Sequence, residues 1–222
     1  MTTITFRTGK CFICGHKGLF PHMASTNQFG SPDLDMRPPE MLRSTMDMWV
    51  QCCDECGYCA PVISKGSPNV NSVINSAEYI KQKSDYVIPK LANQFLRWFI
   101  IERSTGHPAE AGWAALNAAW VCDDHDKVTE ARHCREKAID LFHGARKVGI
   151  SFADDEASES AILIDLLRIC GQFQGANAMC EKALKRESVP ILKDLVLFQI
   201  DLIEKKDINN HCFDEIVEQP HW

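Results

Sequence analysis

The pattern of apolar and polar positions divides the chain into two parts with different regularities. Residues 1–60 show no long helical period. From about Asn71 onward, apolar residues recur at intervals of three and four, which is the period of an amphipathic helix. Residues 61–68 between them are rich in proline and serine and predict a turn or linker. We therefore expect a small head, residues 1–66, and an α-helical domain, residues 67–222.

The second part predicts a mostly α fold made of helices joined by short turns. Ala131, Cys134, Ala138 and Leu141 are spaced so that they share one face of a helix. Proline stands near the predicted start of several helices, where its missing N–H is tolerated. The predicted helices cover residues 71–83, 86–102, a span opening at Pro108, and residues 127–147, 156–170, 174–186 and 190–205.

Two of these helix pairs carry a weak internal repeat. Gly171, Phe173, Ala176 and Ala183 follow one another in the order typical of a tetratricopeptide repeat. The earlier unit, which includes Ala138, lacks the turn glycine, and the two units are about 45 residues apart instead of about 34. The pattern favours an antiparallel, tetratricopeptide-like helical array. Generic paired helices that pack through alanines are the alternative.

Composition changes this picture only in excluding some classes of protein. Hydrophobic residues make up 45% of the 222 and charged residues 24%, as in ordinary globular proteins. The net charge is −6, and residues 1–60 hold five basic and six acidic residues, so a nucleic-acid partner is not expected. No export signal or membrane-spanning run is visible, and we expect a cytoplasmic protein whose eleven cysteines are reduced.

The most specific chemical signal is a pair of cysteine motifs. The same five-residue motif, C-x-x-C-G, occurs twice, as Cys11-Phe-Ile-Cys14-Gly15 and as Cys53-Asp-Glu-Cys56-Gly57. Two thiolates separated by two residues reach one ion from a tight turn, and the following glycine allows φ > 0. The sequence predicts one structural zinc ion bound by four cysteines, with no open position for catalysis. The predicted ligands are Cys11, Cys14, Cys53 and Cys56.

Several alternatives to this ligand set remain open. Cys56 and Cys59 also form a C-x-x-C pair, although no glycine follows Cys59, and Cys52 is a further neighbour. An iron–sulfur cluster has the same need for four thiolates, and unligated buried cysteines are a third possibility. A second metal site assembled from two more distant cysteines and two histidines is a weaker hypothesis. Its candidate ligands are Cys122, His125, His133 and Cys134.

The loop between the two motifs contains Phe-Gly-Ser-Pro-Asp33-Leu-Asp35-Met-Arg37-Pro-Pro-Glu40. Two carboxylates two residues apart can bind a cation or a partner's arginines. A proline-bracketed loop of this kind can equally be structural, with Arg37 holding one of the aspartates. We expect the structural role, and we expect the loop to dock on the helical half or on a partner protein.

Residues 11–61 resemble the N-terminal part of an uncharacterised bacterial family. The shared features are the two C-x-x-C-G motifs, the Phe-Gly-Ser-Pro-Asp-Leu-Asp-x-Arg-Pro-Pro-Glu loop, and Trp49-x-Gln51 before the second motif. The resemblance implies a zinc-ribbon-like head followed by a helical, tetratricopeptide-like tail, and it implies no activity. Cys52 and Cys59 are not part of the family pattern, which supports leaving them out of the metal shell.

These features together favour a non-catalytic adaptor or scaffold protein whose partner is another protein. One alternative is a metal-dependent hydrolase or phosphate-handling enzyme that uses Asp33, Asp35, Arg37 and Glu40. The other is a nucleic-acid-binding zinc ribbon. No nucleophile elbow, phosphate loop or dinucleotide motif is present, so no catalytic residue is assigned. We expect the terminal Trp222 to pack on the body of the protein.

Overall fold

The computed structural model describes residues 2–186 and 190–217, so Trp222 lies outside the described residues. The chain is mostly helical, as predicted, and forms two compact units. The first unit comprises residues 1–27 and 41–144, and the second comprises residues 28–40 and 145–222. The predicted boundary after residue 66 therefore falls inside the first unit, because the head packs directly on the helices that follow it.

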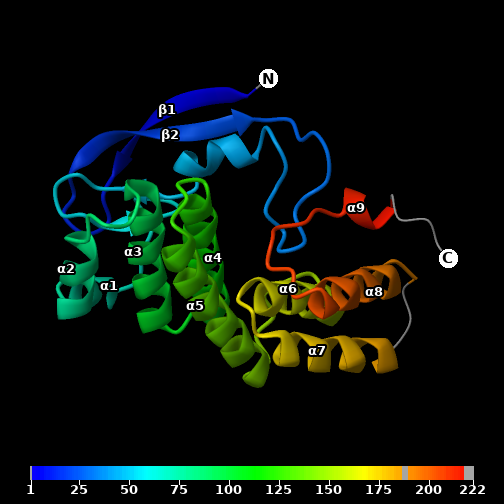
Figure 1. The fold of residues 1–222 in the computed structure, drawn as a ribbon. Coiled ribbons are helices and arrows are strands. Elements are labelled where there is room, and N and C mark those ends of the chain that lie inside the picture. Colours follow the sequence, from blue (N-terminus) through cyan, green and yellow to red (C-terminus); the bar gives the residue numbers. More distant parts are fainter. Residues whose placement is uncertain (1, 187–189, 218–222) are drawn as a thin grey trace. The chain divides into compact units, whose positions relative to one another are not determined.

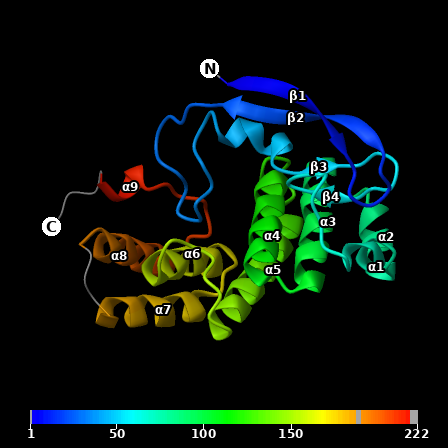
Figure 2. The same ribbon diagram turned by 180° about the vertical axis from the view of Figure 1, so that it is seen from behind.

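Among the described residues, the strands of the first unit form a longer and a shorter antiparallel hairpin (Figures 1 and 2). In the longer hairpin Thr8 lies opposite Leu19, and Phe6 lies opposite Pro21. Side chains alternate across a strand, so Ile4, Phe6 and Leu19 share one face of this ribbon. The strands and the 3-10 helix that follows the first hairpin are β1 (Thr3–Lys10), β2 (Lys17–Ser25), η1 (Arg43–Met48), β3 (Gln51–Cys52) and β4 (Cys59–Ala60).

The helices of the first unit pack through small residues. The helices are α1 (Val70–Ile74), α2 (Ala77–Lys83), α3 (Lys90–Thr105), α4 (Pro108–Asp123) and α5 (Val128–Lys147). α3 and α4 lie side by side in Figures 1 and 2. Ala111, Ala115 and Ala119 on α4 are fully buried, which lets neighbouring helices approach closely. A Cβ added at Gly112 would come under 3.0 Å from the ring of Phe142, so α4 and α5 meet where only glycine fits.

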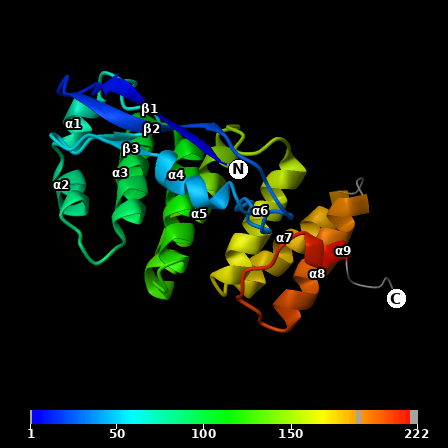
Figure 3. The same cartoon turned by 90° about the horizontal axis from the view of Figure 1, so that it is seen from above.

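In the part of the chain that the structure describes, the second unit combines four helices with the loop of residues 28–40. Its helices are α6 (Glu156–Ile169), α7 (Phe173–Arg186), α8 (Pro190–Glu204) and α9 (Asp214–Val217), and α6 contacts both α7 and α8 (Figure 3). Asp155 caps α6 by accepting a hydrogen bond from Ser158 N at 2.7 Å. The loop contributes Leu34 to the apolar core of the unit. The core residues from the helices are Ala161, Leu195, Phe198, Leu202 and Ile216.

The helix predictions hold within a few residues. The span 127–147 is observed as Val128–Lys147, and the span 156–170 as Glu156–Ile169. The predicted helix 71–83 is two helices, because Ser76 accepts a hydrogen bond from Tyr79 N and starts a new one. The tetratricopeptide-like arrangement of these helices stays a prediction. In the ranges that the structure describes, no helix combines the length and apolar character needed to cross a membrane.

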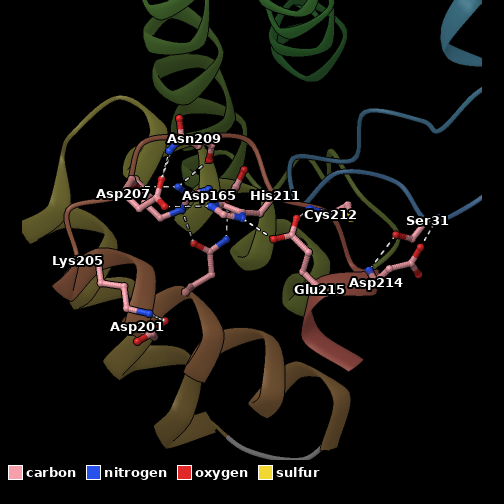
Figure 4. A network of polar contacts seen from close by, with 12 residues as sticks. Ser31, Asp165, Asp201, Lys205, Asp207, Asn209, His211, Cys212, Asp214 and Glu215 are labelled. Atoms are coloured by element: carbon pink, nitrogen blue, oxygen red, sulfur yellow. Dashed lines mark hydrogen bonds and ion pairs between the residues drawn. The ribbon is translucent and has the colours of Figure 1, made fainter. Parts of the chain in front are cut away.

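A buried charged network holds the second unit together (Figure 4). Arg168 on α6 has no exposed surface, and its Nη2 donates to Asp165 Oδ1 at 2.7 Å. Its Nη1 donates to the carbonyls of Asp207 and Asn209 at 2.8 and 2.9 Å. Gln199 on α8 accepts from Arg168 Nε at 2.9 Å and donates to Asp165 Oδ1 at 2.7 Å. The guanidinium therefore connects α6, α8 and the turn after α8.

We predict that Arg168→Met lowers the free energy of unfolding of the second unit by about 3–5 kcal/mol, because Asp165 would remain buried without its cation. The matched control is Lys205→Met, which removes an exposed ion pair with Asp201. That change should cost less than about 1 kcal/mol. Urea unfolding followed by circular dichroism measures both values. Equal unfolding midpoints for the two variants would contradict the role given to Arg168.

Candidate metal centre

Both cysteine motifs fold into the same tight turn at the end of a hairpin. In the first, Cys11 N donates to His16 O at 2.8 Å, and Gly15 N donates to Cys11 O at 3.0 Å. In the second, Cys53 N donates to Tyr58 O and Gly57 N donates to Cys53 O, both at 2.8 Å. Gly15 and Gly57 have φ values of +74° and +79°. The positive φ predicted at both glycines is therefore confirmed.

The two turns bring four cysteine sulfurs together, and these are the four predicted ones. Cys11 Sγ lies 3.7 Å from Cys56 Sγ, and Cys14 Sγ lies 3.6 Å from Cys53 Sγ. All four sulfurs are within 4.8 Å of one another. A tetrahedral ion with metal–sulfur bonds of about 2.3 Å requires sulfur–sulfur distances of about 3.8 Å. The donor set therefore fits a single metal ion.

The stems of two lysines lie over the two turns. The Cε atom of Lys10 is 3.4 Å from the place where a Cβ of Gly15 would stand. Lys83 on α2 occupies the corresponding place at Gly57, and its Nζ donates to Cys56 O at 3.2 Å. Four thiolates around a divalent ion carry a net charge of about −2. The Lys83 ammonium, bonded to the Cys56 carbonyl, is placed to offset part of that charge.

The thiols differ in how readily they lose their protons. Burial raises the pKa of Cys53 and of Cys56 above the ordinary thiol value. A hydrogen bond from the backbone N–H of His16 lowers the pKa of Cys14, which is exposed. A metal ion binds the deprotonated thiols, so metal binding requires Cys53 and Cys56 to release their protons.

Cys52 and Cys59 lie beside the four sulfurs but form a separate pair. Their Cα atoms are partners in the hairpin of β3 and β4. Both sulfurs face the carbonyl oxygen of Gly57, at 3.8 Å from Cys52 and 3.6 Å from Cys59. A hydrogen bond from Cys59 lowers the pKa of Cys52 to about 7; burial opposes this shift and the charge of Arg97 adds to it. Burial raises the pKa of Cys59. The alternative in which Cys59 replaces Cys53 as a ligand is not supported, because Cys53 and not Cys59 belongs to the four-sulfur group.

The second motif is fixed to the helices by contacts that the sequence pattern did not indicate. Tyr79 on α2 donates its hydroxyl to Gly57 O at 2.9 Å, and Arg97 on α3 donates Nη1 to the same oxygen at 2.9 Å. Figure 2 shows β3 and β4 beside α3. Tyr79 and Arg97 are both buried. The sequence offered one signal for the Arg97 contact, namely a charged residue inside an apolar helical stretch, because a buried charge requires a partner.

The Asp33–Glu40 loop has a structural place in the second unit. Asp35 and Arg37 are buried, and Asp35 Oδ1 accepts from Arg37 N at 3.2 Å. Asp33 pairs with Cys212 in an isolated β-bridge, next to a hydrogen bond from Leu34 N to His211 O. Figure 4 shows Ser31 beside Asp214, whose backbone N–H donates to the Ser31 hydroxyl at 2.9 Å. Glu40, at the end of the loop, is exposed. A shared functional role for Asp33, Asp35, Arg37 and Glu40 stays a prediction.

The more distant cysteines and histidines do not gather into a second centre. Cys122 and Cys134 lie next to each other at the junction of α4 and α5, and both are buried. His133 is exposed, and His125 Nδ1 lies 2.9 Å from Val121 O at the end of α4. Throughout residues 2–186 and 190–217, only the four-cysteine group has the spacing that a metal ion requires.

Comparison with protein-family models, with curated proteins and with solved structures gave no match. The resemblance to a bacterial family with a zinc-ribbon-like head therefore stays a prediction. Two features of that resemblance are present in the structure, namely a cysteine group that can hold a metal ion and a mostly helical body.

Proposed function

We propose that this chain is a non-catalytic interaction protein in which one structural zinc ion holds a β-ribbon in place as a binding surface for another protein. The four sulfurs lie at the spacing of a tetrahedral ion, and the group contains no histidine or carboxylate. Four thiolate ligands favour zinc and fill all four of its positions. An ion held in this way stabilises the fold and leaves no position for a substrate.

The observation that carries the binding role is the exposed apolar face of the β1–β2 ribbon. Phe6 and Leu19 are 67% and 68% exposed, and Ile4 on the same face is also exposed. Among the described residues β1 pairs only with β2, so its outer edge presents unpaired backbone groups over eight residues. An apolar face beside an open edge suits a partner that adds a β-strand and covers the side chains.

We predict about one zinc ion per chain by elemental analysis of protein purified without added metal. Cys11→Ser and Cys56→Ser should each abolish binding, because three thiolates no longer close the shell. The matched controls are Cys52→Ser and Cys59→Ser, which remove neighbouring thiols outside the four-sulfur group. The prediction of zinc is wrong if iron copurifies in place of it. The ligand set is wrong if a control variant loses the metal.

We predict that the double variant Phe6→Ser/Leu19→Ser loses its partner while keeping its metal and its helical circular dichroism. Chemical crosslinking in intact cells, followed by peptide mass spectrometry, should place a partner's crosslinks within residues 3–25 of the native chain and remove them in the variant. The matched control is Tyr86→Ser, which removes another exposed aromatic side chain from the same unit. Crosslinks that persist in the double variant, or that disappear in the control, would contradict the proposal.

A nucleic-acid-binding ribbon is the second candidate, and one observation favours it. The acidic residues of the 28–40 loop belong to the second unit, so the hairpin itself, residues 2–25, holds Arg7, Lys10 and Lys17 and no acidic residue. Exposed Phe6 and Phe12 on the same hairpin offer surfaces on which bases stack. This arrangement suits single-stranded RNA or DNA more than duplexes.

The second candidate predicts salt-dependent binding of a fluorescent single-stranded oligonucleotide, measured by anisotropy. Between 50 and 200 mM salt three phosphate contacts should cost on the order of tenfold in affinity. Lys10→Ala/Lys17→Ala should weaken binding further, whereas Lys205→Ala/Lys206→Ala in the other unit should not. Absence of binding at the lower salt concentration removes this candidate and leaves the protein-binding role.

A further inference from the structure

Two of the cysteines outside the four-sulfur group form a second thiol site in the hairpin of β3 and β4. Cys52 in β3 and Cys59 in β4 are directly opposite each other. The neighbouring pair, Cys53 and Tyr58, is joined by a hydrogen bond from Cys53 N to Tyr58 O. Hydrogen-bonded and non-hydrogen-bonded pairs alternate along an antiparallel ladder, so Cys52 and Cys59 form a non-hydrogen-bonded pair.

This register brings the two side chains within bonding reach. Opposed Cα atoms in a non-hydrogen-bonded pair are about 4.5 Å apart. That value lies within the range of about 4.4–6.8 Å that disulfides span. Both sulfurs also lie within 3.8 Å of one oxygen atom, that of Gly57, and therefore point to the same side of the hairpin.

The neighbouring cysteine of the four-sulfur group, Cys53, points away from this pair. Cys52 and Cys53 are consecutive in an extended segment, so their side chains point to opposite faces. Cys53 faces the four-sulfur group, whereas Cys52 faces Cys59. Cys52 is half-buried and Cys59 fully buried, so solvent reaches the pair through Cys52 alone.

We propose that Cys52 and Cys59 form a reversible disulfide beside the metal centre, with a low-molecular-weight disulfide such as glutathione disulfide as the oxidant. Cys52 Sγ attacks one sulfur of glutathione disulfide, releases its proton to solvent and expels one glutathione thiolate, which gives a mixed disulfide at Cys52. Cys59 Sγ then attacks Cys52 Sγ, releases its proton and expels the second glutathione. Two protein thiols are oxidised, and one glutathione disulfide is reduced to two glutathione molecules.

The order of attack follows from burial. The half-buried Cys52 meets the oxidant, and the fully buried Cys59 resolves the mixed disulfide from inside. The product links β3 to β4 beside the Gly57 carbonyl, which accepts hydrogen bonds from Tyr79 and Arg97. The site therefore changes the covalent structure of the second metal-binding turn without removing a metal ligand. It does not depend on which partner the ribbon binds.

The test treats the metal-loaded full-length chain with glutathione disulfide and counts free thiols, glutathione adducts and bound metal. The native chain should lose two thiols, keep its metal and carry no lasting adduct, and dithiothreitol should restore both thiols. Cys59→Ser should trap one glutathione at Cys52, and Cys52→Ser should lose no thiol. Fragment mass spectra should place the native bond between residues 52 and 59.

A control variant, Cys122→Ser, removes one thiol of the other close pair and should still show the loss of two thiols. The proposal is overturned if the native chain keeps all its thiols. It is equally overturned if thiols disappear only together with the metal, which would show oxidation of the ligands. Bound metal is counted in the reduced chain before treatment, so absence of the metal centre is distinguished from failure of the thiol site.

Discussion

The carbonyl of Gly57 is where the second metal-binding turn is fixed to the helices of the first unit. It accepts hydrogen bonds from Tyr79 and Arg97, which lie 22 and 40 residues further along the chain. The turn can present this oxygen and still close its own hydrogen bond to Cys53 because glycine takes φ of +79°. The positions of Cys53 and Cys56 therefore depend on α2 and α3 as well as on the local motif.

Two cationic side chains from the helices contact this turn, although the chain has a net charge of −6. A shell of four thiolates around a divalent ion is anionic, and its surroundings must offset that charge. Lys83 and Arg97 contribute cationic groups from the helices, each through a hydrogen bond to a carbonyl of this turn. A metal ion held by the four cysteines would therefore interact electrostatically with these helices, which also pack on the turn.

Both units use a buried arginine on a helix to fix a distant piece of backbone. Arg97 donates to Gly57 O in the first unit, and Arg168 donates to the carbonyls of Asp207 and Asn209 in the second. The planar guanidinium suits this role because it presents five donors at fixed angles. Arg168 also has a buried carboxylate partner, Asp165, so its charge is balanced inside the core.

The sequence by itself determined most of the helices, the group of four cysteines and the positive φ of Gly15 and Gly57, because period, spacing and φ are local properties. It did not determine that residues 28–40 join the C-terminal unit, because a β-bridge from Asp33 to Cys212 connects residues 179 positions apart, as their numbers show. Nor did it indicate that Cys52 opposes Cys59, or that Tyr79 and Arg97 meet Gly57. Such pairings depend on strand register and helix packing, which only the tertiary structure decides.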